Sequence, residues 1–275
     1  MITVRSEVGT DGADAFRERL FDRMKLRLWG ALVLGAIVVA AAIATSAALA
    51  SSWGRDALRN VVAACVVAKS TIGASFPCTD VRLDAPGADG YALIRSPGYA
   101  SEFLLTPLAP IDGIESPALQ NSSATGFWSA AWATRANVAA ALGKQLPRNA
   151  VALAVNAEGT RTQDHFHIHV DCLRNSVATA LASNASRISD QWSKLPKPLR
   201  GDAYWARTIA GSDLDGVNIP KLMAQSPPAA DITLDHATVG VVPATLRDGS
   251  DGFYLLVNWT DSSAERLLDH QCRGR

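Results

Sequence analysis

The stretch His165-Phe166-His167-Ile168-His169-Val170 alternates an imidazole with an apolar side chain at every position. A period of two is that of a β-strand with one buried face. The pattern therefore predicts a strand whose three histidines project to one face, while its three apolar residues enter the core. The whole chain has only five histidines, and imidazole suits proton transfer, nucleophilic attack or metal ligation near neutral pH. We therefore interpret this face as a functional site.

The segments around this strand predict an α+β fold, in which an antiparallel sheet is flanked by helices and a C-terminal extension returns to the sheet. Short apolar runs between turn residues predict the other strands, and apolar residues at helical spacing predict the helices. The expected strands are 91–95, 102–106, 150–156, 238–242 and 252–257. The expected helices are 56–62, 126–142, 176–192 and a further one over 199–207. Within the second of these helices, Trp128 and Trp132 are expected in the core.

The N-terminal part of the chain has the pattern of a membrane anchor. No charged residue occurs from Leu28 to Gly54, and the apolar run 28–50 is long enough to cross a bilayer. Five Lys and Arg residues lie between Arg17 and Arg27, so the positive-inside rule predicts a cytoplasmic segment 1–27 and an exported domain 55–275. The expected location is therefore the inner (plasma) membrane, with a single pass and the domain on the periplasmic side. A cleaved signal peptide is the alternative, because Ala48-Leu49-Ala50 has the form of a cleavage site.

Charge and cysteine content agree with an exported protein that does not bind nucleic acid. The 26 Lys and Arg residues balance 26 Asp and Glu residues, whereas non-specific nucleic-acid binders usually have a basic excess. Four cysteines in an oxidising compartment predict two disulfides among Cys65, Cys78, Cys172 and Cys272. The sequence leaves all three pairings open. The absence of a Cys-x-x-Cys motif argues against a structural zinc site.

Three kinds of chemistry fit the histidine face. Neighbouring histidines on a strand lie about 6.6 Å apart, so two of them can share a metal ion, but the outer pair would need a bulge and a fourth ligand such as His236 or His270. General acid–base catalysis with another nucleophile is the second possibility. The third is attack by histidine itself on phosphorus, which needs no metal or cofactor and is the chemistry we expect.

The polar turn before the histidines is suited to holding phosphate. Asn156 ends the preceding strand, and Arg161, Thr162 and Gln163 lie in the turn. Their side chains and the backbone N–H groups can bind phosphate oxygens as charge moves during a reaction. We therefore predict these four residues as substrate-binding residues. His236 is expected at the surface, and His270 is expected to support the C-terminal disulfide.

These residues carry a resemblance to known families. The order Asn156, Gly159, a polar turn and then the alternating histidines resembles the histidine-triad superfamily of nucleotide hydrolases and transferases. A closer resemblance, over residues 60–273, is to the bacterial CDP-diacylglycerol pyrophosphatases. The stretches that carry it are Thr160 to His169, Gly113-Ile114-Glu115-Ser116-Pro117, Phe127-Trp128 with Trp132, Leu199-Arg200-Gly201 and Asp269-His270-Gln271-Cys272.

The resemblance implies a HIT-like domain that hydrolyses CDP-diacylglycerol to phosphatidate and CMP. It implies that His167 is the nucleophile that carries CMP, while His165 and His169 orient it and bind phosphate. The substrate would be a lipid in the membrane. One departure is that Arg161 and Thr162 stand where many histidine-triad proteins have Gly-Gln-Ser. The alternatives are a hydrolase or transferase for soluble nucleotide diphosphates, and a non-catalytic nucleotide- or metal-binding module of the envelope; the oligomeric state stays open.

Overall fold

A computed structural model describes residues 54–84, 89–121, 124–227 and 232–273. Within these ranges no helix combines the length and apolar character required to cross a bilayer. The predicted cytoplasmic segment 1–27 and the predicted anchor 28–50 lie outside the described residues.

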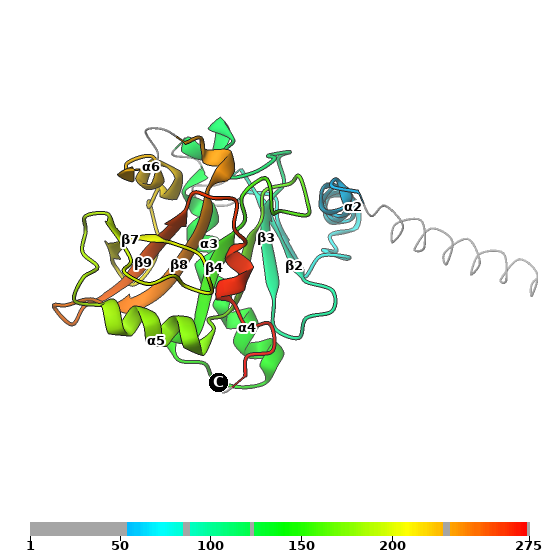
Figure 1. The fold of residues 1–275 in the computed structure, drawn as a ribbon. Coiled ribbons are helices and arrows are strands. Elements are labelled where there is room, and N and C mark those ends of the chain that lie inside the picture. Colours follow the sequence, from blue (N-terminus) through cyan, green and yellow to red (C-terminus); the bar gives the residue numbers. More distant parts are fainter. Residues whose placement is uncertain (1–53, 85–88, 122–123, 228–231, 274–275) are drawn as a thin grey trace, which may run out of the picture. The chain divides into compact units, whose positions relative to one another are not determined.

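The described residues form an α+β fold built on one antiparallel sheet, as the sequence predicts (Figure 1). Nine strands in the described part pair in the order β1-β2-β3-β5-β4-β8-β9-β7-β6, and every neighbouring pair is antiparallel. The strands are β1 (Asp80–Arg82), β2 (Tyr91–Arg95), β3 (Phe103–Pro107), β4 (Val151–Val155), β5 (Ile168–Cys172), β6 (Ser193–Lys194), β7 (Trp205–Ala210), β8 (Thr238–Thr245) and β9 (Asp251–Asn258).

Helices cover both faces of this sheet. The α-helices are α2 (Ala57–Ile72), α3 (Gly126–Ala133), α4 (Arg135–Leu142), α5 (Asn175–Asn184) and α6 (Ile219–Met223). The short 3₁₀ turns are η1 (Pro117–Gln120), η3 (Arg148–Ala150), η5 (Leu234–His236) and η6 (Ala264–Leu267). The predicted strands are therefore confirmed to within a few residues, whereas β1, β6 and β7 had no counterpart in the prediction.

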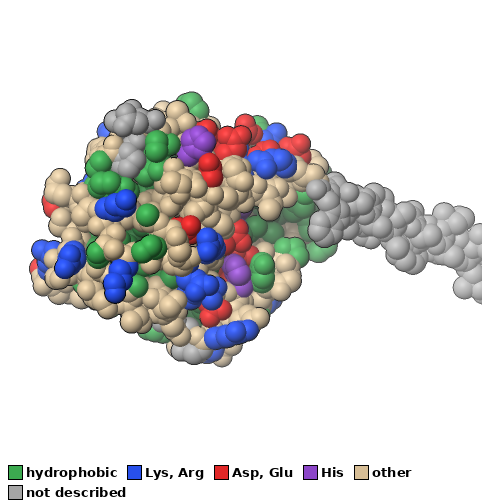
Figure 2. All heavy atoms as spheres, in the orientation of Figure 1, with side chains coloured by type: hydrophobic (Ala, Val, Ile, Leu, Met, Phe, Trp, Pro, Cys, Tyr) green, Lys and Arg blue, Asp and Glu red, His purple; other side chains and the backbone are tan. Residues whose placement is uncertain are grey.

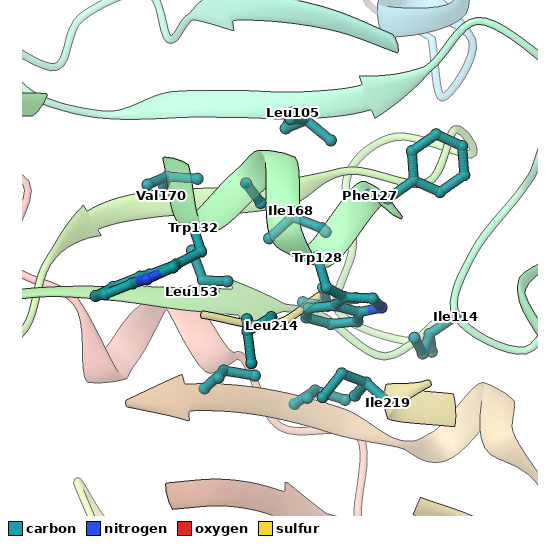
Figure 3. Close-up of a cluster of buried hydrophobic side chains, with 14 of the residues drawn as sticks. Leu105, Ile114, Phe127, Trp128, Trp132, Leu153, Ile168, Val170, Leu214 and Ile219 are labelled. Atoms are coloured by element: carbon teal, nitrogen blue, oxygen red, sulfur yellow. The ribbon is translucent and has the colours of Figure 1, made fainter. Parts of the chain in front are cut away.

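Side chains alternate between two cores along the central strands. In β4, Leu153 and its alternate neighbours join the core under α3 and α4, while Ala152 and Ala154 join the core under α5 and η6. Figure 3 shows the first core, where Trp128 and Trp132 of α3 lie over Leu153 and the apolar residues of β5. Because helices cover both faces, even the polar face of a central strand is withdrawn from water.

Each of the four helix predictions differs from the structure. The helix expected over 126–142 is divided at Thr134. The N–H of Thr134 donates hydrogen bonds to the carbonyl oxygens of Ala130 and Ala131, and its hydroxyl donates another to that of Ala130. Such back-bonding by threonine bends a helix. The helix expected over 176–192 ends at Asn184, and the helix expected over 199–207 is wrong because Trp205–Ala210 is β7, which pairs with β9. Conversely, α2 extends to Ile72, where Gly73 ends it with a positive φ of 73°.

The four cysteines form two disulfides, which selects one of the three possible pairings. Cys65 of α2 is bonded to Cys78, and Cys172 at the end of β5 is bonded to Cys272. The second bond closes a separation of 100 residues. It therefore holds the C-terminal segment against the strand that carries His169.

Candidate active site

The three histidines lie at the start of β5 but are not all in the strand. Hydrogen-bonded pairing begins at Ile168, so His165 and His167 precede β5 and only His169 belongs to it. Their exposed fractions are 1, 7 and 6 % in chain order. An alternating polar face is usually exposed on a strand, but His167 is buried because β5 is a central strand of the sheet. The alternating apolar residues enter the core as predicted.

The backbone fixes the tautomers of the first two histidines. His165 Nε2 lies 3.0 Å from the carbonyl oxygen of Pro107, and His167 Nδ1 lies 2.7 Å from the carbonyl oxygen of His165. A carbonyl oxygen only accepts hydrogen bonds, so each of these nitrogens donates one. A neutral His167 therefore carries its proton on Nδ1 and keeps the lone pair of Nε2.

Burial keeps His167 neutral. Removal from water, together with the neighbouring charge of His169, lowers the pKa of His167 to about 3. The two rings approach edge to face with centroids 4.8 Å apart. Because the pKa lies well below 7, the nucleophilic form of this imidazole predominates at physiological pH.

A buried carboxylate that the sequence interpretation missed orients His169. Glu102 has a side chain only 2 % exposed, and its Oε1 accepts a hydrogen bond of 2.9 Å from His169 Nδ1. Burial acts to raise the pKa of Glu102, but the hydrogen bond and charge of His169 outweigh it, so the pKa is lowered. Glu102 therefore stays ionised beside the histidines.

A second imidazole–carboxylate pair lies next to Glu102. His270 Nδ1 donates a 2.8 Å hydrogen bond to the fully buried Asp171 and lies 3.5 Å from Glu102. Burial acts to lower the pKa of His270, but the carboxylates of Asp171 and Glu102 raise it overall. As expected, His270 lies close to the Cys172–Cys272 disulfide, since Asp171 also contacts the Sγ atom of Cys272.

Arg161 is a buried cation of the polar turn. Its Nη1 lies 2.9 Å from both carboxylate oxygens of Glu115, and its Nε lies 3.0 Å from Asp164. Only 6 % of its side chain is exposed. The hydrogen bonds of Arg55 and Arg161 overcome the effect of burial and lower the pKa of Asp164 to about 2. Arg161 is therefore held rigidly rather than solvated.

Gly113 makes room for this arrangement. A Cβ on Gly113 would lie 2.0 Å from Arg161 Nη1 and 2.4 Å from Glu115 Oε2. No real side chain tolerates such contacts. The Gly113-Ile114-Glu115 stretch thus places the carboxylate of Glu115 beside Arg161, and the missing side chain of Gly113 leaves the space for it.

The other predicted binding residues have partners within the chain. Asn156 accepts a hydrogen bond from the backbone N–H of Ala264 and donates one to Glu265, at 2.8 and 2.5 Å. Gln163 accepts from the N–H of Leu58 at 2.7 Å, which ties the turn to α2. Thr162 has an exposed side chain. His236 is exposed, as expected, and is paired with Asp261.

Two overlapping groups of side chains have a composition that a metal ion accepts. In Glu102, His169 and Glu265, and likewise in Glu102, Asp171 and His270, the candidate ligand atoms lie within 4.8 Å of one another. Imidazole and carboxylate ligands of this kind suit zinc. In both groups, however, the imidazole Nδ1 atoms already donate to carboxylates. The hydrogen bonds therefore account for the arrangement, and the prediction of no metal stays a prediction.

An α+β domain with a neutral buried imidazole, a second oriented imidazole and a clamped arginine has the groups that an enzyme of phosphoryl-group transfer uses. Residues 53–275 match the family model described as CDP-diacylglycerol pyrophosphatase. The CDP-diacylglycerol pyrophosphatase of Yersinia pestis is 32 % identical over 225 residues, which cover 79 % of this chain and 84 % of that protein. The chain belongs to the CDP-diacylglycerol pyrophosphatase family. The resemblance to the CDP-diacylglycerol pyrophosphatases found in the sequence is thereby confirmed, and with it the assignment to the hydrolases.

Proposed function

We propose that the domain hydrolyses CDP-diacylglycerol in two steps through His167. In the first step, His167 Nε2 attacks the phosphorus that carries cytidine, and phosphatidate leaves. In the second step, water releases CMP from the imidazole. The hydrogen bond from His167 Nδ1 to the carbonyl of His165 is the observation that carries this proposal, because it directs the lone pair of Nε2 away from the backbone.

The low pKa of His167 supports the role of nucleophile. An imidazole that holds a proton on both nitrogens cannot attack phosphorus, and a pKa of about 3 keeps Nε2 unprotonated at neutral pH. The leaving group is a phosphate monoester, which departs with little help from an acid. Nucleophilic catalysis therefore suits this substrate without a metal or cofactor.

The neighbouring residues have supporting roles in this proposal. Glu102 fixes the ring of His169 edge to face with the ring of His167, and His169 is the second imidazole that binds the substrate phosphate in this proposal. His165 supplies the carbonyl that orients His167. Arg161 shapes the phosphate-binding turn, in which Thr162 offers an exposed hydroxyl. Asn156 and Gln163 act in binding by holding the segments that border the site.

The proposed covalent intermediate between His167 and CMP can be detected by measuring the intact mass of the protein. Purified protein is mixed briefly with CDP-diacylglycerol in detergent and quenched at alkaline pH, where phosphoramidates survive. We expect an intact mass increased by CMP in the wild type and in the His236→Ala control, whose histidine is exposed, but not in His167→Ala. CMP release without any adduct at early times would move the attack from His167 to water.

We also propose that this enzyme is anchored in the inner membrane by residues 28–50, with a HIT-like domain outside the cytoplasm. The two disulfides of the described domain support an oxidising compartment, and a lipid substrate supports a membrane location. Protease added to spheroplasts should degrade residues 55–275 and spare residues 1–27. Protection of the domain until the membrane is lysed would refute this orientation, and a mature chain that begins after residue 50 would favour the cleaved signal.

A further inference from the structure

We propose that Glu265, which the C-terminal extension carries, activates the water that releases CMP from His167. The inference rests on the proposed function, because it assigns a residue to the second step of that mechanism. Glu265 lies in η6, far from the histidines in sequence, and the extension had no assigned role.

Asn156 holds Glu265 at the site. The amide oxygen of Asn156 accepts hydrogen bonds from the N–H of Ala264 and the hydroxyl of Ser263, at 2.8 and 3.3 Å. Its amide nitrogen donates a hydrogen bond of 2.5 Å to Glu265 Oε1. Asn156 is only 5 % exposed, so one rigid side chain at the end of β4 fixes both the backbone and the carboxylate of η6.

The sheet allows η6 to approach closely. In Figure 1 the red helical turn near the C-terminus lies over β4, and the contacts of η6 with β4 and β8 agree. A Cβ on Gly240 of β8 would lie 2.7 Å from Leu267 Cδ1. The absence of that atom lets Leu267 pack directly on the sheet, which anchors the turn that carries Glu265.

The carboxylate of Glu265 faces the histidines. Its Oε1 lies 3.4 Å from His169 Nε2, and its Oε2 lies 3.9 Å from His270 Nε2. The ring of His169 is in turn next to that of His167. Nε2 of His169 is buried and makes no hydrogen bond within the described structure, so the ring of His169 lies between the Glu265 carboxylate on one side and the ring of His167 on another.

Exposure distinguishes Glu265 from Glu102. The Glu102 side chain is 2 % exposed and its Oε1 is committed to His169, whereas the Glu265 side chain is 32 % exposed. A general base for hydrolysis must reach both water and the site. Among the carboxylates near the triad that the structure describes, Glu265 meets both conditions.

The step balances with water as the only co-reactant. The water oxygen forms a bond to phosphorus while Glu265 accepts the proton from that water. The phosphorus–nitrogen bond breaks, and its electron pair returns to His167 Nε2, so the ring becomes neutral while Nδ1 keeps its proton. CMP leaves, and Glu265 then releases its proton to solvent.

The test is a rapid-quench experiment on the full-length Glu265→Gln variant in detergent. Glutamine keeps the oxygen that accepts from Asn156 but is not a base. We expect a burst of about one phosphatidate per enzyme, persistence of the CMP adduct, and CMP release slowed about 10²- to 10³-fold. Asp248→Asn is the matched control, since Asp248 is an exposed carboxylate in the turn between β8 and β9, away from the site, and it should behave as wild type.

A second variant separates a chemical role from a structural one. In Glu265→Ala, azide should restore turnover and yield the CMP azide, because azide attacks phosphorus without a base. Adduct formation in the wild type with unchanged CMP release in Glu265→Gln would overturn the assignment. Loss of wild-type activity in EDTA, restored by a divalent cation, would make Glu265 a metal ligand and overturn it too. Absence of the adduct in every protein, with phosphatidate and CMP released together, would instead refute the His167 intermediate.

Discussion

The neutral, buried state of His167 predicts an acid sensitivity of folding that His167→Gln should remove. The pKa of His167 is about 3 in the folded protein, against 6.5 for an ordinary histidine. Between these two values the unfolded chain binds a proton that the folded protein excludes. The free energy of unfolding therefore falls as the pH is lowered through 6.5.

The size of the effect follows from these pKa values. A pH of 5 lies 1.5 units below the pKa of His167 in the unfolded chain. The free energy of unfolding is therefore about 2 kcal/mol lower at pH 5 than at pH 7.5. The folded pKa lies about two units lower still. A change of one unit in that folded value would therefore hardly alter the result at pH 5.

Urea unfolding of wild type and His167→Gln at pH 7.5 and pH 5 measures this difference. Glutamine is neutral at both pH values and retains an N–H that can donate to the His165 carbonyl. Between pH 7.5 and pH 5, we expect the free energy of unfolding of the variant to fall by about 2 kcal/mol less than that of the wild type. His236→Gln serves as a control of opposite sign, because Asp261 raises the pKa of His236 and protonation there favours the folded state. An equal loss in wild type and His167→Gln would show that the folded protein protonates His167 and would refute the reasoning.

Two further predictions concern the architecture around the site. Gly113→Ala should displace Arg161 and lower the free energy of unfolding by about 2 kcal/mol, because the new Cβ would lie 2.0 Å from Nη1. In an Arg161→Ala background, Gly113→Ala should lower the free energy of unfolding, measured in urea, by much less than in the wild type. An equal decrease in both backgrounds would contradict the steric cause. Replacing Cys172 and Cys272 by serine should cost about 4.7 kcal/mol, against about 2.9 kcal/mol for the other disulfide, since the separations are 100 and 13 residues. Comparable losses from the two disulfides in the same assay would contradict a chain-entropy origin.

The sequence by itself determined the features that depend on neighbours along the chain. The alternation around His167 predicted which residues enter the core, and the apolar runs predicted the strands that pair as β2 with β3 and as β8 with β9. The motifs around the histidines also indicated the CDP-diacylglycerol pyrophosphatase family. These signals are local because strand periodicity and turn chemistry involve only a few consecutive residues.

The same local signals misled where tertiary packing dominates. A polar face on a strand predicts exposure only when that face meets water, but other segments of the fold bury all three histidines. The segment 199–207 was predicted as a helix, but its end belongs to β7, which pairs with β9. Burial and pairing of this kind depend on the strand order, which the alternation does not contain.

Only the tertiary structure decided which carboxylates serve the histidines. Glu102 looked like the first residue of a strand, and Glu265 like a polar residue of an extension, yet they lie 2.9 and 3.4 Å from opposite nitrogens of His169. Antiparallel register places β3 beside β5, and Asn156 and the Cys172–Cys272 disulfide bring the C-terminus back to the site. Electrostatic interactions act through space, so the pKa values and partners of these groups follow from the packing of segments that are far apart in the chain.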